Sequence, residues 1–244
     1  MLPMKPHDFR YRQFLPTIIL QCMRWYLRYP LSYRNLEEMM EERGVEVDHT
    51  TLYRWVQKYS PELEKRIRWH ARTFCRSWHL DETYLRVKGK WKYLYRAIDK
   101  NGGTIDFMLS STRNYQAAYI FLKNALKKTR VNERPLKITT DKHPCYAPAI
   151  QALKKEKLLK PHVEHRQTRY LNNVIESDHR RIKRRTRPMM EFKSLVSAKR
   201  VIKGIEAMNM IVKKQSYFFA DSIHDQIYFI HRIFNIYTRT MSKI

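Results

Sequence analysis

The sequence has little glycine, few cysteines, a deficit of acidic residues and no long apolar run. Five glycines among 244 residues exclude a collagen-like or glycine-rich low-complexity chain. Three widely spaced cysteines argue against a disulfide framework and against a paired-cysteine zinc site. No apolar run reaches the roughly 18–20 residues that cross a bilayer, and the opening segment MLPMKPHDFR has no apolar core of a secretory signal. We therefore expect a protein of a reducing, cytoplasmic compartment, with no membrane partner.

Basic residues dominate the charge. The 49 Lys and Arg exceed the 23 Asp and Glu, which gives a net charge of +26. Self-repulsion of this size opposes compaction unless a polyanion neutralises it, and nucleic acid is the usual polyanion in a cell. A membrane-binding protein would concentrate its charge in one amphipathic helix, whereas here the charge runs through the whole chain. With 43% hydrophobic and 13% aromatic residues the chain is not a disordered basic tail. We expect a nucleoid-associated protein that binds double-stranded DNA; a ribosome-associated or merely very soluble protein is the alternative.

Three helices are predicted near the N-terminus. Apolar residues recur at helical spacing over residues 15–29. Ser32 is a good N-cap for a second helix, and Gly44 suits the left-handed position that ends it. Asp48 caps a third helix, which Pro61 is expected to limit.

The second and third of these helices form a helix-turn-helix pattern, so we expect residues 1–60 to be a DNA-binding domain. In that motif the second helix enters the major groove. Four polar residues of this helix fall largely away from its apolar side and are predicted DNA contacts: Thr50, Arg54, Gln57 and Lys58. The alternative is an ordinary helical hairpin that packs on another part of the chain.

A different periodicity begins after a basic linker, helical or irregular, at residues 61–76. Three alternating segments separated by short turns predict an antiparallel meander. Helices and two further strands follow, so the order is βββαβαβα, which suits a mixed α/β fold with helices on the faces of a five-stranded sheet. The expected strands are 78–88, 91–97, 105–109, 136–140 and 163–167, and the expected helices are 117–126, 147–160 and a basic one from Asn172.

This second domain is expected to span residues 77–204, followed by a helical tail at 205–244. The tail carries large apolar residues at helical spacing. Two interpretations stay open, that these residues complete the core and that they form a dimer surface. They are Ile205, Met208, Met210, Ile211, Phe218, Phe219, Ile223, Ile227, Ile230 and Phe234.

Three carboxylates occupy positions where a catalytic site is expected. Asp81 lies within the first strand, Asp141 ends the fourth strand, and Glu176 lies in the first turns of the last basic helix, with 59 and 34 residues between them. Converging carboxylates repel one another, and Mg²⁺ or Mn²⁺ relieves that repulsion because hard cations prefer oxygen ligands. Two such ions about 3.5–4 Å apart stabilise an in-line phosphoryl displacement.

Structural roles are the alternative for these acids. Asp141 then caps the following turn, Asp81 pairs with a lysine, and Glu176 is solvated. Glu82 and Asp178 are rival acids, but Glu82 points to the opposite strand face and Asp178 lies about 200° around the helix from Glu176. Four histidines also offer metal ligands without a paired helical spacing: His143, His162, His165 and His179.

The helix that carries Glu176 is strongly basic over residues 179–185. Arg180 and Lys183 follow Glu176 by four and seven residues and therefore share its face. We predict that Arg180, Lys183 and Arg184 contact the DNA backbone. A merely solvated helix face is the alternative.

Four strings carry a resemblance to a known family: LSYRNLEEMMEERGVEVDHTTLYRWVQKYSPEL, WHLDETYLRVKGKWKYLYRAIDKNGGTIDFMLS, ITTDKHPCY and YLNNVIESDHRRIKRR. They resemble the small DDE transposases of bacterial insertion sequences, and among these insertion sequence family six (IS-six). The resemblance covers roughly residues 9–213. It implies an RNase H-like catalytic domain in which Asp81 of DET, Asp141 of TTDK and Glu176 of NNVIESDH are the catalytic metal ligands. Lys183 fills the family's basic position seven residues after the Glu.

The resemblance also implies a function. The helix-turn-helix would bind the terminal inverted repeats of the element, and two Mg²⁺ or Mn²⁺ ions would serve cleavage at the 3′ ends and strand transfer into target DNA. Transposition would be replicative, with cointegrate formation, and two ends must meet, so at least a homodimer is expected. A non-catalytic helix-turn-helix regulator and an RNase H-like nuclease without joining activity are the alternatives.

Overall fold

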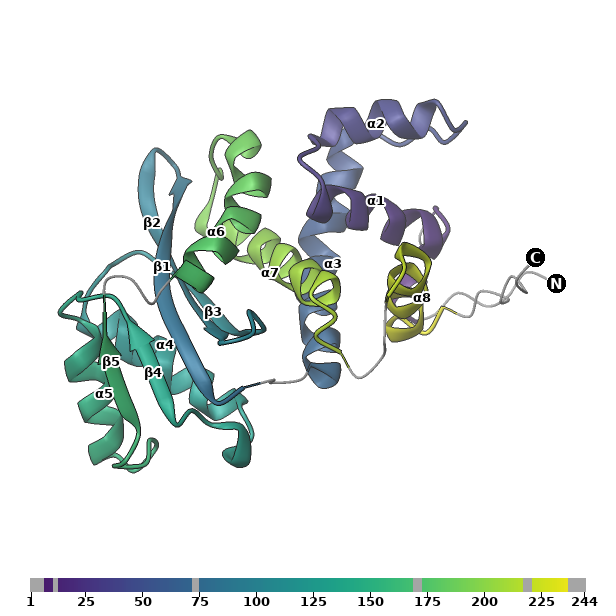
Figure 1. The fold of residues 1–244 in the computed structure, drawn as a ribbon. Coiled ribbons are helices and arrows are strands. Elements are labelled where there is room, and N and C mark those ends of the chain that lie inside the picture. The colour runs from purple at the N-terminus through teal and green to yellow at the C-terminus, as the bar shows by residue number, and fades with distance from the viewer. Residues whose placement is uncertain (1–6, 11–12, 72–74, 169–172, 217–220, 237–244) are drawn as a thin grey trace. The chain divides into compact units, whose positions relative to one another are not determined.

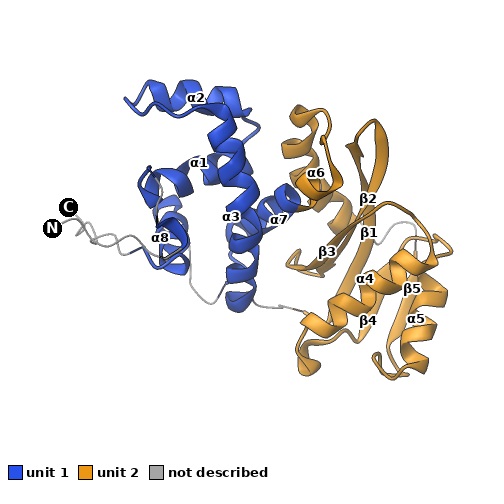
Figure 2. Cartoon of the chain, turned by 180° about the vertical axis from the view of Figure 1, so that it is seen from behind, with its two compact units in different colours: residues 1–71, 200–244 blue, residues 72–199 orange. Residues whose placement is uncertain are grey.

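The chain folds into two compact units, shown as a computed structural model in Figure 1 and coloured separately in Figure 2. The structure describes residues 7–10, 13–71, 75–168, 173–216 and 221–236. Unit 1 comprises residues 1–71 and 200–244, and unit 2 comprises residues 72–199. This division differs from the predicted one, because the C-terminal residues join the N-terminal helices in one unit instead of forming a separate tail.

Unit 1 is helical, and the starts of its second and third helices are those the sequence predicts. Ser32 forms a capping box with Asn35 at the start of α2, and the Asp48 carboxylate accepts the backbone N–H of Thr50 (2.7 Å) at the start of α3. Gly44 adopts φ +68° after α2. Its helices are α1 (Pro16–Arg28), α2 (Tyr33–Glu41), α3 (His49–His70), the C-terminal part of α7 (Leu195–Val212) and α8 (Ile223–Ile233), with a short 3-10 turn at His7–Phe9.

The third helix does not stop at Pro61. It continues to His70, so the segment 61–70 of the predicted linker is helical. A proline inside a helix costs about 3 kcal/mol. Tyr59, Leu63 and Ile67 are all buried on one side of α3, and burying each such side chain stabilises by about 1.5–3 kcal/mol. Packing on both sides of the proline therefore outweighs its local cost.

The apolar residues of the predicted tail complete the core of unit 1. The Phe234 ring packs against Phe9, with 5.8 Å between ring centroids, and against Tyr59 at 6.4 Å. In α7 the absence of a side chain at Gly204 allows a close approach, because a Cβ there would lie 2.6 Å from Ser60 Oγ. Fully buried members of the set are Ile205, Met208, Met210, Ile211 and Ile230, whereas Phe218 and Phe219 lie outside the described residues. Most of these side chains are thus already covered within the chain.

Unit 2 is built on a five-stranded mixed sheet. The strands are β1 (Ser77–Val87), β2 (Lys90–Asp99), β3 (Thr104–Ser110), β4 (Lys137–Thr140) and β5 (Glu164–Gln167). Their order across the sheet is β3-β2-β1-β4-β5. The first three strands pair antiparallel, and β1, β4 and β5 pair parallel. The predicted meander and the mixed sheet are both confirmed.

Helices cover both faces of this sheet (Figure 1). The helices α4 (Tyr115–Lys128) and α5 (Tyr146–Lys155) pack on one face over a core that includes Trp78, Leu80 and Tyr95. The helix α6 (Asn173–Thr186) lies against β1 on the other face. The expected start of α6 at Asn172 lies outside the described residues. The observed order βββαβαβα is the predicted one, so the mixed α/β fold class is confirmed. Within the described part of the chain, no helix is both long and apolar enough to cross a lipid bilayer.

The three thiols differ in burial, which predicts their reactivity. Burial raises the pKa of Cys22 and of Cys145 to about 12, so at pH 8 only about one molecule in 10⁴ carries the reactive thiolate at either position. Cys75 is only half-buried. We expect a thiol-reactive dye at pH 8 to modify Cys75 well before the other two cysteines. After unfolding in guanidinium all three should react alike; equal rates in the native protein would contradict this assignment of burial.

Candidate active site

The parallel pairing of β1 with β4 places Asp81 and Asp141 at the same level of the sheet. His79 of β1 pairs with Thr139 of β4, and continuing that register by two residues sets Asp81 beside Asp141. Neighbouring strands lie about 4.7–4.9 Å apart. Both side chains are half-buried, with 19% of Asp81 and 36% of Asp141 exposed. Asp81 in β1 and Asp141 directly after β4 therefore each lie two residues beyond the last β1–β4 pair, His79 with Thr139.

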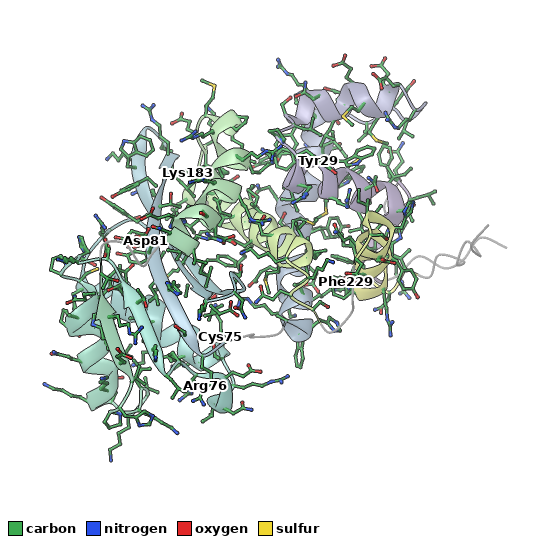
Figure 3. All side chains as sticks on the ribbon, viewed as in Figure 1. Tyr29, Cys75, Arg76, Asp81, Lys183 and Phe229 are labelled. Carbon is green, nitrogen blue, oxygen red and sulfur yellow. The ribbon has the colours of Figure 1, made fainter. Side chains whose placement is uncertain are left out.

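The helix α6 brings the third acid to the same part of unit 2. His179 Nε2 of α6 lies 3.2 Å from Asp81 Oδ2. Glu176 precedes His179 by three residues, which places it about 60° around the helix and about 4.5 Å along its axis. The Glu176 side chain is exposed. Figure 3 labels Asp81 on the sheet and Lys183 on α6, the helix that bears Glu176.

A buried ion pair fixes α6 on the sheet. Arg96 lies opposite Asp81 in the antiparallel register of β1 and β2, and its side chain is fully buried. Arg96 Nη2 donates to Asp178 Oδ2 at 2.6 Å, and Arg96 Nη1 lies 3.4 Å from His179 Nδ1. The rival acid Asp178 is thus engaged in the attachment of the helix, and its rotation away from Glu176 is as predicted.

The other rival acid, Glu82, faces the opposite side of β1. It accepts a hydrogen bond from the Tyr146 hydroxyl of α5 and another from Arg113 Nε. Burial raises the pKa of Glu82, against the lowering effects of the Tyr146 hydrogen bond and of Arg113. Arg113 Nη2 also lies 3.4 Å from Asp141 Oδ2. Arg113 therefore links the structural carboxylate of one sheet face to a predicted catalytic carboxylate.

The three predicted metal ligands are not gathered into an ion-binding cluster in this conformation. Among the described residues, no group of three or more His, Cys, Asp or Glu side chains is close enough to hold a metal ion. Asp81 is engaged by His179 and Asp141 by Arg113. The alternative prediction, that Asp81 pairs with a lysine, is wrong, because Asp81 contacts His179.

Asp141 and two of the candidate histidines have local partners. Asp141 Oδ1 also accepts the backbone N–H of His143 at 3.0 Å, as the turn-capping alternative predicts. His165 Nε2 lies 2.9 Å from Thr140 Oγ1, and burial lowers the pKa of His165. These contacts hold the segment after β4 in place.

The predicted DNA contacts are mostly exposed, with one correction. Arg180 and Arg184 are exposed on α6 and Lys183 is half-buried, while Thr50, Arg54 and Lys58 are exposed on α3. Gln57 is only 7% exposed, so its interpretation as a DNA contact is wrong. The helical-hairpin pattern considered only α2 as a packing partner of α3. In the structure α1 also packs on α3, and Gly204 of α7 lies against Ser60 in the middle of α3.

Sequence patterns did not predict the roles of Arg96, Arg113 and Tyr146. A signal exists for Arg96, which stands between Leu94 and Ile98 at an inward-facing position of β2. A buried arginine requires an anionic partner. No spacing rule connects Arg113 or Tyr146 to an acid on β1, because these contacts arise only when α4 and α5 pack on the sheet.

Comparison with known proteins identifies the family. The family model of the IS240-type DDE domain matches residues 75–215, a range that contains Asp81, Asp141 and Glu176. The transposase of the insertion sequence-like element IS431mec from Staphylococcus aureus strain Mu50 is 44% identical over 207 residues, which cover 84% of this chain and 89% of that protein. The chain belongs to the family of insertion-sequence DDE transposases. The transposase of IS257 in transposon Tn4003 of Staphylococcus aureus is 43% identical over the same lengths, so this transposase is an IS-six type member, as the sequence motifs predict.

Solved structures offer weaker likenesses to this transposase. The catalytic core domain of HTLV-2 integrase in complex with magnesium matches with a TM-score of 0.42 and 17% identity, over 55% of this chain and 86% of that one. The catalytic core domain of BIV integrase matches with a TM-score of 0.42 and 16% identity, over 58% and 86%. Family membership rests on the family model and the sequence relatives.

Proposed function

We propose that Asp81, Asp141 and Glu176 are the catalytic carboxylates of this transposase and together hold two divalent ions, Mg²⁺ or Mn²⁺. The observations that support the proposal are the parallel pairing of β1 and β4, which ends two residues before Asp81 and Asp141, and the 3.2 Å contact between Asp81 and His179 of α6, the helix that bears Glu176. The donor set fits such ions, because it consists only of carboxylate oxygens, the ligands that hard cations prefer. When bound, the ions supply charge neutralisation at the attacking and leaving oxygens.

The proposed reaction has two steps at phosphorus. First, a water oxygen forms a bond to the phosphorus at the element's end while the bond to the 3′ oxygen breaks; the water releases a proton and the leaving 3′ oxygen takes one up. The new 3′-hydroxyl then attacks a phosphodiester of target DNA and loses its proton, while the bond from phosphorus to the target 3′ oxygen breaks and that oxygen takes up a proton. The chain's own contribution is to orient these groups, and no Ser or Tyr nucleophile is required.

Ion binding has to compete with contacts already present. The Asp81 carboxylate faces His179, and the Asp141 carboxylate faces Arg113. Asp81, Asp141 and Glu176 would hold the ions, and ion binding would replace these two contacts. Without ions, the His179 ring contacts Asp81, and the positive charge of Arg113 lies near Asp141 and reduces the repulsion between carboxylates there.

DNA binding is proposed for both units separately. In unit 1, Thr50, Arg54 and Lys58 of α3 read the terminal inverted repeats, supported by their exposure and by the capped start of α3. In unit 2, Arg180, Lys183 and Arg184 hold backbone phosphates beside Glu176. Bringing two ends together requires at least a homodimer, and the proposed outcome is a replicative cointegrate.

A single joining assay tests this function. The protein is incubated with end-containing DNA, target DNA and Mg²⁺, and covalently joined products are measured on a denaturing gel. We expect joined products that disappear when EDTA removes the divalent ion. Binding without cleavage would identify a non-catalytic regulator, and hydrolysis without joining would identify a nuclease; either result contradicts the proposal.

A further inference from the structure

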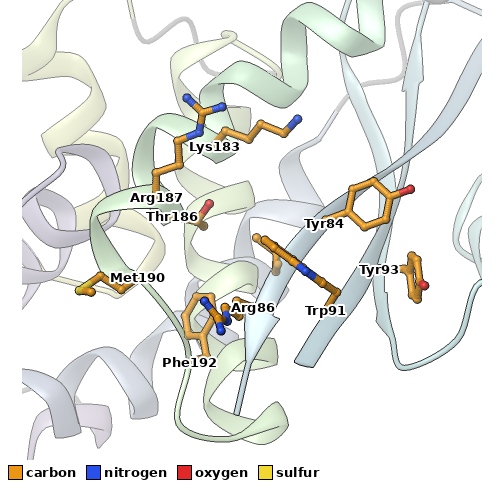
Figure 4. A pocket seen from close by; sticks show the side chains of 10 residues that line it. Tyr84, Arg86, Trp91, Tyr93, Lys183, Thr186, Arg187, Met190 and Phe192 are labelled. Carbon is orange, nitrogen blue, oxygen red and sulfur yellow. The ribbon is translucent and has the colours of Figure 1, made fainter. Parts of the chain in front are cut away.

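An aromatic and basic pocket lies at the far end of the β1–β2 hairpin (Figure 4). Its volume is about 620 Å³, which is in the range of pockets that hold small organic ligands. None of the residues that line it is acidic, and all belong to unit 2. They are Tyr84, Leu85, Arg86, Trp91, Tyr93, Lys183, Thr186, Arg187, Met190 and Phe192.

The hairpin supplies the aromatic wall. β4 pairs with β1 only over its first three residues, so the later part of β1 extends beyond that partner. The antiparallel register pairs Tyr84 with Tyr93 and Arg86 with Trp91, which puts these four side chains on the same face of the hairpin. The Tyr84 and Tyr93 rings lie 5.5 Å apart.

The second wall is held to the hairpin by backbone hydrogen bonds. Phe192 N donates to Arg86 O at 2.9 Å, and Lys88 N donates to Phe192 O at 3.0 Å. This pairing ties the segment after α6 to the edge of β1 that β4 leaves uncovered. Figure 4 shows Lys183 and Arg187 on one side of the pocket and the aromatic residues of the hairpin on the other.

The aromatic side chains are exposed although they are large. Trp91 is 62% exposed and Tyr84 is 45% exposed. Clustered exposed aromatic residues mark binding surfaces, and exposed rings beside cations match a nucleic-acid strand, whose bases stack on aromatic faces and whose phosphates pair with basic residues. Lys183 joins the pocket to the basic face of α6.

We propose that this pocket binds an unpaired DNA nucleotide, with the base stacked on Trp91 and the adjoining phosphate held by Lys183 and Arg187. This proposal rests on the proposed function, because the unpaired base would belong to the DNA on which the transposase acts. Proteins that hold an extruded base stack it against aromatic or apolar side chains in a fitted pocket. The pocket thereby favours DNA with frayed or single-stranded segments over fully paired DNA.

The test measures binding without chemistry. In EDTA, the affinity of the full-length protein is measured for a 12-nucleotide oligothymidylate and for a blunt 12-base-pair duplex. Replacing Trp91 by Ala should weaken oligothymidylate binding by about 5- to 150-fold, the loss that corresponds to one stacked base, and change duplex binding less than about twofold. Trp91→Phe keeps a stacking face and should retain most of the affinity.

Two further variants separate stacking from charge and from general exposure. Trp69 of α3 is 80% exposed and outside the pocket, so Trp69→Ala should leave both affinities unchanged. Lys183→Gln should lower the salt dependence of binding by about one unit of slope, because it removes one phosphate contact. Trp91→Ala should leave that slope unchanged.

Several outcomes overturn the proposal. The first is an oligothymidylate affinity that is unchanged in Trp91→Ala. The second is an affinity that Trp91→Ala lowers equally for the duplex and for the single strand. The third is a Trp91→Ala variant whose oligomeric mass changes while its DNA affinity does not, which would indicate a protein contact. A second measurement is independent of any substitution: oligothymidylate carrying 5-bromodeoxyuridine should photo-cross-link to the peptide that contains Trp91, and cross-links confined to other peptides contradict the site. Because no ion is present, failure here is distinct from failure of the joining assay.

Discussion

Replacing Asp81, Asp141 or Glu176 by Ala is expected to abolish strand joining while binding to end-containing DNA survives. Each carboxylate contributes negative charge to the proposed ion site, and the ions stabilise the transition state by several kcal/mol. Losing that stabilisation lowers the rate by roughly 10³-fold or more. The measurement is the yield of joined product over time in Mg²⁺, together with a gel-shift assay of end binding for each variant.

The charge-removing substitutions Asp81→Asn, Asp141→Asn and Glu176→Gln refine this experiment, because they keep the shape of each side chain and should be as inactive as the Ala variants. Glu164→Gln is a matched control. Glu164 is an exposed acid on β5 whose carboxylate lies 2.6 Å from Arg166 Nε. It pairs in the sheet with Lys137, at the other end of β4 from Asp141. Its activity should stay within about twofold of the wild type. Near-normal joining by any one of the three variants would contradict the assignment of that residue as a catalytic carboxylate.

Breaking the buried pair between Arg96 and Asp178 is expected to destabilise the protein strongly. Both side chains are buried, and Arg96 Nη2 lies 2.6 Å from Asp178 Oδ2. Arg96→Met removes the guanidinium that lies 2.6 Å from the buried Asp178 carboxylate, and Asp178→Asn removes the charge that faces the buried Arg96 guanidinium. Removing one partner of such a pair typically costs about 3–5 kcal/mol. The measurement is the free energy of unfolding from urea titration of each variant.

Arg181 provides a control in the same place. Arg181 Nε lies 3.5 Å from Asp178 Oδ1, but the Arg181 side chain is 49% exposed. Arg181→Ala should therefore cost less than about 1 kcal/mol. If Arg96→Met costs no more than Arg181→Ala, the buried pair does not anchor α6.

The double variant Arg96→Met with Asp178→Leu separates stability from positioning. Replacing a buried pair by apolar side chains is often neutral for stability, so much of the lost free energy of unfolding should return. Joining should stay reduced, because the directional contact that orients α6, and with it Glu176, is gone. Full recovery of joining with recovered stability would show that packing alone orients the helix.

Local patterns predicted the elements of this protein well. Caps at Ser32 and Asp48, the turn at Gly44 and the alternation in β1 are encoded within a few residues, and local sterics and hydrogen bonding enforce them. The mixed sheet followed from the order of those elements. The prediction that Pro61 limits the third helix was wrong. It considers only the local cost of a proline in a helix and not the burial of Tyr59 and Leu63 on either side of the proline.

Residue type and spacing predicted the residues of the candidate site, but they did not predict the side-chain contacts that these residues make. Asp81, Asp141 and Glu176 stand out from the motifs, whereas the pairing of Asp81 with His179 and of Asp141 with Arg113 joins residues far apart in the sequence. Gln57 shows the same limit, since a helix face that looks polar becomes buried once a third element packs on it.

The sequence by itself determined the charge, the order of helices and strands, and the three carboxylates that we propose as catalytic. Only the tertiary structure decided which carboxylates form structural ion pairs and that an aromatic pocket lies beside Lys183. The physical reason is that periodicity and capping depend on neighbours along the chain, whereas register, burial and the pairing of charges depend on neighbours in space.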